Sequence, residues 1–117
     1  MEPTLKINLK ETSAGQNYQV VEFHGDFDKA GHTDVRPELD KIVKEFVLAD
    51  LIFDFADLKF INSESIGYLM EIHAHLVKIG KALKIVGANE HVKEVLQTIG
   101  IAEVIPMYND LNSYLNK

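Results

Sequence analysis

The stretch from Leu51 to Leu69 constrains the fold of this chain more than any other. It opens with the apolar run Leu51–Phe55, interrupted by one aspartate, as in a strand that is covered on both faces of a sheet. Polar residues follow, and apolar side chains at helical spacing begin after Ser63. The stretch therefore predicts a buried strand, a short polar loop and a helix whose first turn carries Ser63.

The rest of the chain continues this alternation of strands and helices. Alternating apolar and polar residues predict a half-exposed strand over 5–9, and a β-rich run over 18–23 predicts its hairpin partner. The other predicted elements are a helix beginning near Thr33–Arg36, a helix over 63–79, a strand over 83–86, a helix from Asn89 to Ile99, a strand over 101–105 and a helix over 110–115. The order ββαβαβαβα favours an α/β fold with a mostly parallel mixed sheet, an N-terminal β-hairpin and about four helices.

Glycine and proline set several of these boundaries. Gly25 is expected to end the second strand, so Asp26 and Asp28 are expected in a loop. Pro37 fits only the first turn of a helix, which places the start of that helix just before it. Gly100 is expected to end the helix that carries Ile99.

Length and composition narrow the class of protein. The 117 residues suit one domain, 1–117, and the 46% hydrophobic content suits a packed core. The formal charge of −6 disfavours nucleic acid as a partner. Without cysteine, the chain has no thiolate metal ligand or cysteine nucleophile, and no segment has the roughly 18 apolar residues of a membrane span. We expect a cytoplasmic protein that is not embedded in a membrane.

Ser63 is the residue at which a modification would change the surface most. Free backbone N–H groups and the positive end of the helix dipole surround a hydroxyl in the first turn of a helix. A phosphate would be tolerated there by the fold, but it would add about −1.5 to −2 charge to the surface. Ser63 is either a phosphorylation site or simply the cap of its helix, since serine is a common N-cap.

The ordered motifs of the chain resemble those of STAS domains, in particular the bacterial anti-sigma factor antagonists. The first is the strand Val20–Phe23 followed by Gly25 and Asp26. The second is the apolar strand ending at Phe55, followed by a helix opening with Phe60-Ile61-Asn62-Ser63-Glu64-Ser65-Ile66-Gly67. The strand Leu83–Gly87 and the segment Val95–Ile101 match the closing half of the family, so the resemblance covers about residues 5–115.

This resemblance implies the STAS (SpoIIAA-like) fold and a regulatory binding module that is not an enzyme and carries no cofactor. It implies that the unphosphorylated protein binds an anti-sigma factor, itself a serine kinase of the GHKL type, and so releases a sigma factor. That kinase would phosphorylate Ser63, and a phosphatase would reset the switch. The resemblance also implies that Asp28 lies near Ser63 and the partner surface. We predict that the partner contacts Asp26, Asp28, Asn62, Ser63, Glu64, Ser65, Gly67 and Tyr68, and that the protein is a monomer or weak dimer.

The chain departs from the family pattern at two positions. Asn62 stands where the family has aspartate, and it can still cap the helix although it supplies no negative charge. Ser65 stands where the family has glycine, and it is a second candidate phosphate acceptor. The alternative interpretation is a STAS-type scaffold or small-ligand sensor with a degenerate phosphosite.

Other chemistry finds less support in the sequence. His73 and His75 are two apart on a helix and point to different faces, so they cannot chelate a metal together. A triad of Ser63, His24 and Asp28 lacks the strained glycine-flanked turn of hydrolases. Asp54 interrupts a strand and is expected to satisfy backbone donors at the strand end. We therefore predict no metal and no catalytic residues.

Overall fold

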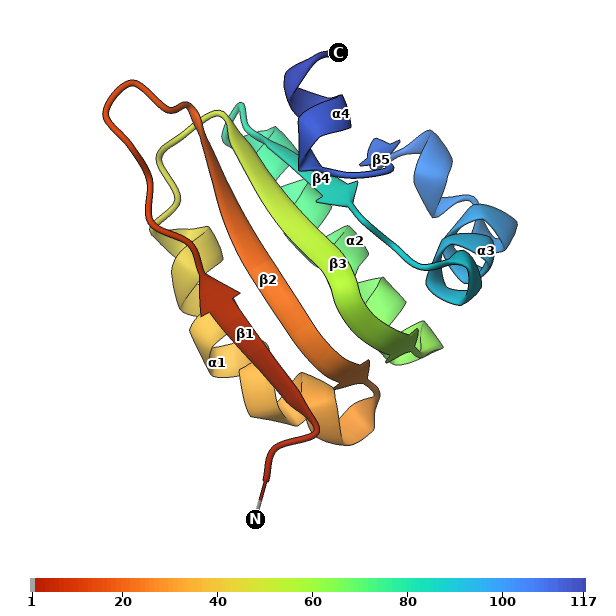
Figure 1. Ribbon diagram of the computed structural model, residues 1–117. Coiled ribbons are helices and arrows are strands. Elements are labelled where there is room, and N and C mark those ends of the chain that lie inside the picture. Colours follow the sequence, from red (N-terminus) through yellow and green to blue (C-terminus); the bar gives the residue numbers. More distant parts are fainter. Residues whose placement is uncertain (1) are drawn as a thin grey trace.

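The computed structural model of the protein describes residues 2–117 and shows a five-stranded mixed sheet with helices on both sides (Figure 1). The elements in chain order are β1 (Leu5–Leu9), β2 (Tyr18–Phe27), α1 (Lys29–Lys44), β3 (Asp50–Ile61), α2 (Ser63–Lys78), β4 (Ala82–Val86), α3 (Glu90–Ile99), the 3₁₀ turn η1 (Ile101–Glu103), β5 (Met107–Tyr108) and α4 (Leu111–Leu115). The predicted order of strands and helices is confirmed, except near residues 101–108.

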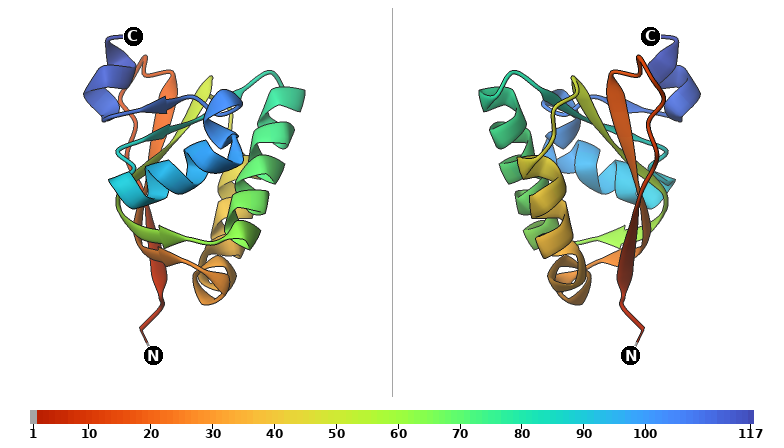
Figure 2. Two further views of the ribbon diagram at one scale, coloured as in Figure 1. Left: turned by 90° about the vertical axis from the view of Figure 1, so that its right-hand side faces the viewer. Right: turned by 90° about the vertical axis from the view of Figure 1, so that its left-hand side faces the viewer.

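The strands lie in the order β1-β2-β3-β4-β5, so every strand neighbours the next in sequence. β1 and β2 form the predicted antiparallel hairpin, and all other pairs are parallel. The crossovers through α1 and α2 put both helices on one face of the sheet, while α4 lies on the other face (Figure 2). Because β2 and β3 are parallel and each is followed by a helix, the first turns of α1 and α2 both lie at the carboxyl ends of these strands (Figure 1).

Both predicted strand ends near the site were wrong, because β2 and β3 continue further. Gly25 does not end β2: with φ +123° it allows the chain to pass within contact of β1, where a Cβ would lie 2.2 Å from the carbonyl oxygen of Thr4. β2 therefore runs to Phe27 through a shift in register after Gly25. The expected polar loop after Phe55 is also strand, since β3 stays paired with β2 as far as Ile61.

The expected start of α1 was wrong for a related reason. The carboxylate of Asp28 accepts from the backbone N–H of Gly31 at 2.8 Å and begins the helix two turns before Pro37. Pro37 then lies inside the helix, where it deprives the carbonyl of Thr33 of its usual donor. Both residues are exposed, so water can satisfy that carbonyl, and the capped N-terminus and the buried face of α1 outweigh the cost.

The last predicted strand was misplaced by a few residues. Gly100 ends α3 in the left-handed conformation, as expected, but the chain continues as the turn η1 rather than as a strand. β5 forms only at Met107–Tyr108, where it pairs with the end of β4. The final helix starts after its cap Asp110, near its predicted position.

The two faces of the sheet carry unequal hydrophobic clusters. The larger one lies under α1 and α2 and contains the rings of Phe23, Phe27, Phe53 and Phe55. The smaller one, beneath α4, consists of Val20, Ile52, Val86 and Tyr114. None of the helices between residues 2 and 117 is both long and apolar enough to cross a membrane.

Candidate functional site

The candidate site lies where the ends of β2 and β3 pass into α1 and α2. Phe27 and Ile61 are neighbours in register at the ends of these strands, and the backbone N–H of Asn62 donates to the carbonyl of Phe27 at 3.1 Å. The two helix N-termini therefore lie side by side, capped by Asp28 and Asn62 respectively. We call the surface formed by Asp28, Asn62, Ser63 and Glu64 the Ser63 face. Asp26, also predicted for the site, alternates along β2 with the buried Phe27, so its side chain points to the other face of the sheet.

Ser63 is the first residue of α2 and is exposed. Its neighbour Asn62 caps the helix, because the Asn62 side-chain oxygen accepts from the backbone N–H of Ser65 at 2.8 Å. The capping role considered for Ser63 is therefore wrong, while that of Asn62 is confirmed. Within residues 2–117 the Ser63 hydroxyl makes no hydrogen bond, so it lies free on the surface beside the unpaired N–H groups of the first turn.

The acidic residues predicted for the site differ in their exposure and in the hydrogen bonds that they make. Asp28 caps α1 and also accepts from the hydroxyl of Thr4 at 3.4 Å, so its carboxylate is partly used by the fold. Asp26 belongs to β2, paired with Phe60, and is half-buried. Glu64 follows Ser63 and is exposed. Glu64 and the cap Asp28 of the neighbouring helix give the Ser63 face negative charge, which a phosphate on Ser63 would increase.

Ser65 does not lie on the Ser63 face, which contradicts its place among the candidate acceptors and contact residues. It is 0% exposed, and its hydroxyl finds no hydrogen-bond partner within residues 2–117. The side chain points into the interior because residues two apart on a helix face different sides. A kinase cannot reach a hydroxyl that is sealed in this way, and Ser63 remains the candidate acceptor. Gly67, in contrast, is exposed, with nothing within 4 Å of where a Cβ would lie.

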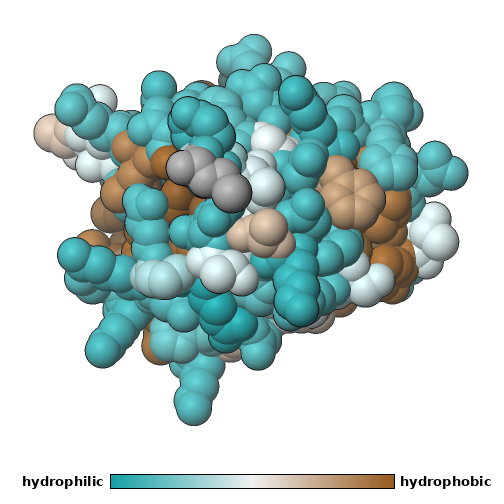
Figure 3. All heavy atoms as spheres, turned by 90° about the horizontal axis from the view of Figure 1, so that it is seen from below, coloured by the Kyte–Doolittle hydropathy of each residue, from teal (hydrophilic) through white to brown (hydrophobic). Residues whose placement is uncertain are grey.

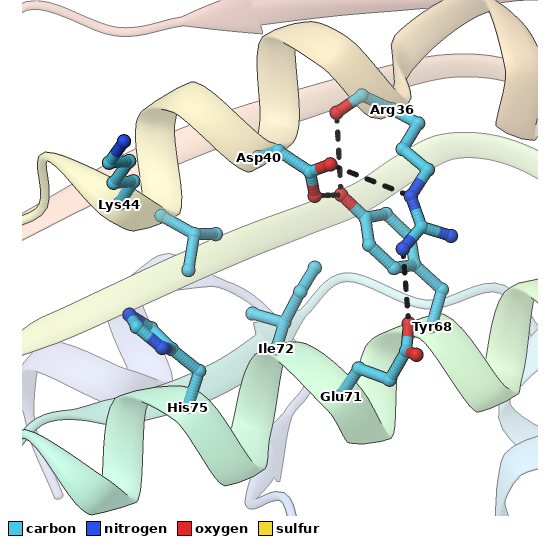
Figure 4. A pocket seen from close by; sticks show the side chains of 8 residues that line it. Arg36, Asp40, Lys44, Tyr68, Glu71, Ile72 and His75 are labelled. Carbon is cyan, nitrogen blue, oxygen red and sulfur yellow. Dashed lines mark hydrogen bonds and ion pairs between the residues drawn. The ribbon is translucent and has the colours of Figure 1, made fainter.

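Tyr68 is also buried, contrary to its prediction as a contact residue. It is 3% exposed, and its hydroxyl donates to Asp40 of α1 at 2.5 Å, while Arg36 lies over its ring at 4.5 Å. Burial, together with the hydrogen bond to Asp40, raises the pKa of Tyr68 far above its ordinary value. Figure 4 shows the tyrosine bridging α1 and α2 at one end of a groove of about 440 Å³, beside Arg36, Asp40 and Glu71. Tyr68 thus fixes the spacing of the two helices that carry the Ser63 face.

His32 lies within α1, before the helix start that the sequence predicted near Thr33–Arg36. Its ring stacks on Tyr68 at 4.7 Å between centroids, and its Nδ1 lies 3.9 Å from Glu64. The guanidinium of Arg36 donates to its other ring nitrogen at 3.2 Å. In the sequence, the only hint of this contact was the spacing of four residues between His32 and Arg36, which brings two side chains together on a helix. His32 connects the first turns of α1 and α2 behind the Ser63 face.

The remaining candidates lie away from this face or serve the fold. His24 is in β2, where its Nδ1 lies 3.0 Å from Asp57 on the open face of the sheet. Asp54 accepts from the backbone N–H of Ala56 at 3.0 Å, as predicted for a carboxylate that satisfies backbone donors. Among residues 2–117 no group of three histidine or acidic side chains is arranged to hold a metal ion.

Comparison with known proteins identifies the family. The STAS domain model matches residues 10–114, nearly the whole chain. The chain belongs to the STAS family. Within this family, its fold is similar to an anti-sigma factor antagonist from Mycobacterium paratuberculosis, with a TM-score of 0.84 and 16% identity over 99% of this chain and 95% of the other.

Two further solved structures show the range of proteins that share the fold. The unphosphorylated form of the anti-sigma factor antagonist SpoIIAA superposes with a TM-score of 0.73 and 15% identity, covering 93% of each chain. A sulfate transporter family protein from Wolinella succinogenes gives a TM-score of 0.74 and 16% identity over 90% of this chain and 87% of the other. No curated protein matches the sequence significantly. At these identities the superpositions establish the fold of this STAS domain and leave its partner to be argued from its own residues.

Proposed function

We propose that this STAS domain is an anti-sigma factor antagonist, a binding module that does no chemistry of its own and acts in the cytoplasm. When unphosphorylated, it binds an anti-sigma factor that is a GHKL-type serine kinase, and the sigma factor is released. Phosphorylation of Ser63 by that kinase ends the binding, and a phosphatase restores it. The whole chain, residues 1–117, serves as one such domain.

The observation that carries this proposal is the exposed Ser63 hydroxyl at the start of α2. Because Asn62 caps the helix, the Ser63 hydroxyl is free to accept a phosphate without loss of the cap. The helix N-terminus tolerates the new charge, with a gain of roughly 0.3–1 kcal/mol per favourable charge. A partner that covers Ser63 does not tolerate it, since a buried uncompensated charge costs several kcal/mol.

The resemblance of the fold to anti-sigma factor antagonists supports the same interpretation. The proteins of known structure with that description share the arrangement of sheet and helices found here. Asn62 in place of the usual aspartate keeps the cap geometry, so it leaves Ser63 accessible. Asn62 is neutral, so the negative charge that an aspartate would place before Ser63 is missing. Glu64 places a negative charge directly after Ser63.

Incubation with ATP and each purified GHKL-type anti-sigma factor of the source genome, followed by intact mass measurement, tests the proposal. We expect one added phosphate on the wild type and on Ser65→Ala, and none on Ser63→Ala. Ser63→Asp should lose binding to the kinase that binds the wild type. If the kinase binds wild type and Ser63→Asp equally and adds no phosphate, the STAS-type scaffold is the better description.

A further inference from the structure

The side of α3 that faces solvent carries apolar residues that a helix packed on a sheet does not need. Val92 and Leu96 already provide its buried side. Ile99 is 53% exposed, and Val95 is only half-buried. α3 is therefore apolar on two sides, and its second side lines a shallow groove of about 370 Å³ with His91, Glu94, Val95, Thr98 and Ile99.

Phe60 extends this apolar side of α3 toward the site. It is 41% exposed at the end of β3, and its ring stacks on that of His91 with centroids 6.4 Å apart. β4 pairs with β3 only as far as Asp54, and α3 takes its place beside the last part of β3. Seen from below, hydrophobic side chains show among hydrophilic ones on the side of the molecule where α3 lies (Figure 3).

The position of α3 relative to β3 is held by a specific contact. The Asn89 side chain caps α3 through the backbone N–H of Val92 at 2.8 Å and also donates to the carbonyl of Leu58 at 3.0 Å. One side chain thus ties the first turn of α3 to β3, two residues before Phe60. The stacked pair of Phe60 and His91 consequently has a defined position at the end of β3, two residues before the α2 cap Asn62.

We propose that Phe60 and the outward side of α3, namely His91, Glu94, Val95 and Ile99, form a second contact surface that continues the Ser63 face. We call it the α3 strip. The proposal rests on the proposed function, since the occupant is the same protein that reads Ser63. That partner presents an apolar surface with basic side chains at its edge.

The charges around the α3 strip define the chemistry of this partner. Glu90 and Glu94 of α3 and Glu64 at the start of α2 are exposed, against Lys59 beside Phe60 and the half-buried Lys93, so acidic groups outnumber basic ones here; the chain as a whole carries a net charge of −6. An apolar centre with an acidic edge is complementary to an apolar patch edged by lysine and arginine. Half-exposed aromatic residues such as Phe60 contribute strongly to binding when a partner buries them.

The test measures the affinity of variants for each purified GHKL-type anti-sigma factor of the source genome. Phe60→Ser and Ile99→Ser remove the exposed apolar groups. The controls are Leu9→Ser and Val77→Ser, because these residues are exposed to the same extent, 43% and 54%, but lie on β1 and α2. Circular dichroism and thermal melting verify that all four variants fold.

We expect Phe60→Ser and Ile99→Ser each to weaken binding about tenfold or more, and both controls to stay within about twofold of the wild type. Glu94→Lys should also weaken binding, and more strongly at low salt than at high salt, because salt screens the repulsion from basic side chains of the partner. Glu38→Lys on α1 should leave the affinity unchanged. Unchanged affinity of Phe60→Ser and Ile99→Ser, with binding lost in Ser63→Asp, would overturn the α3 strip but leave the proposed function intact.

Two other outcomes would contradict the proposed function rather than the α3 strip alone. If Phe60→Ser and Ile99→Ser lose binding while Ser63→Asp binds as the wild type does, the strip is a partner surface and the phosphorylation switch is wrong. If no anti-sigma factor binds the wild type, the proposed function fails, and the partner named for the strip fails with it.

Discussion

The two faces of the sheet are held by different kinds of interaction. Under α1 and α2, Phe23 packs against Phe53 and Phe55 with centroids 4.8 and 5.1 Å apart, and the charged groups Asp40 and Arg36 join this large apolar cluster at Tyr68. Under α4, a small apolar cluster depends on Asp50, which accepts from the Tyr114 hydroxyl and from Lys84 at 3.0 Å. The difference shows that ring packing dominates the large core, whereas the five-residue helix α4 over the small cluster depends mainly on the polar contacts of one carboxylate.

The largest expected effect comes from the face under α1 and α2. Phe23→Ala leaves a cavity among three other phenylalanine rings that cannot all close around it. We expect a loss of about 3–5 kcal/mol in the free energy of unfolding, measured by urea denaturation. A loss below about 1 kcal/mol would show that this core is loosely packed and would remove the contrast between the faces.

A smaller effect is expected where α4 covers the sheet. Tyr114→Phe removes the hydroxyl that bonds to Asp50 but keeps the ring, so we expect a loss of about 1–2 kcal/mol. Tyr108→Phe is the control, because no hydrogen bond of its hydroxyl occurs within residues 2–117. Equal losses in both variants would mean that the bond to Asp50 adds nothing beyond the effect of removing a tyrosine hydroxyl in this cluster.

The same cluster predicts a dependence of stability on pH. Burial alone would raise the pKa of Asp50, but the hydrogen bonds from Tyr114 and Lys84 outweigh it and hold the pKa below its ordinary value of 3.8. A depressed carboxyl pKa gives stability that is present above about pH 4 and lost as the pH falls through the folded-state value. Urea denaturation from pH 7 to 2 should show a steeper acid loss in the wild type than in Asp50→Asn, and parallel curves would contradict the prediction.

The smallest effect has the opposite sign and belongs to the face under α1 and α2. The Ser65 hydroxyl is buried without a partner, so Ser65→Ala removes an unsatisfied group and improves helix propensity. We expect a gain of about 1 kcal/mol by urea denaturation, against little change for exposed Ser63→Ala. Destabilisation by Ser65→Ala would indicate that water or a partner group satisfies this hydroxyl.

Much of the fold was predictable because local signals agreed with the tertiary structure. The apolar run after Leu51, the caps Asn62 and Asn89 and the terminator Gly100 all predicted elements that the structure contains. The errors concern glycine and proline, which usually mark the end of a strand and the first turn of a helix but have other roles here. Gly25 permits a close strand contact and Pro37 is carried within a helix that a capping aspartate starts earlier.

The candidate site, too, was predictable only where local signals sufficed. The position of Ser63 at the start of α2 and the cap at Asn62 could be read from the motif. The burial of Ser65 and Tyr68 could not, because the side of a helix that faces the sheet depends on how the helix is rotated against it. The exposure of Ile99 could not be read for the same reason, since α3 has apolar residues on both sides and periodicity alone does not choose between them.

The amino-acid sequence by itself determined the alternation of strands and helices and the place of Ser63 at the start of a helix, because periodicity, caps and glycines act over a few neighbouring residues. Only the tertiary structure decided which side chains of those helices reach the surface. It brought the caps Asp28 and Asn62 together across the ends of two parallel strands and left Phe60 and Ile99 uncovered. Exposure is a property of how elements pack on each other, and it is decided by contacts between residues far apart in the chain.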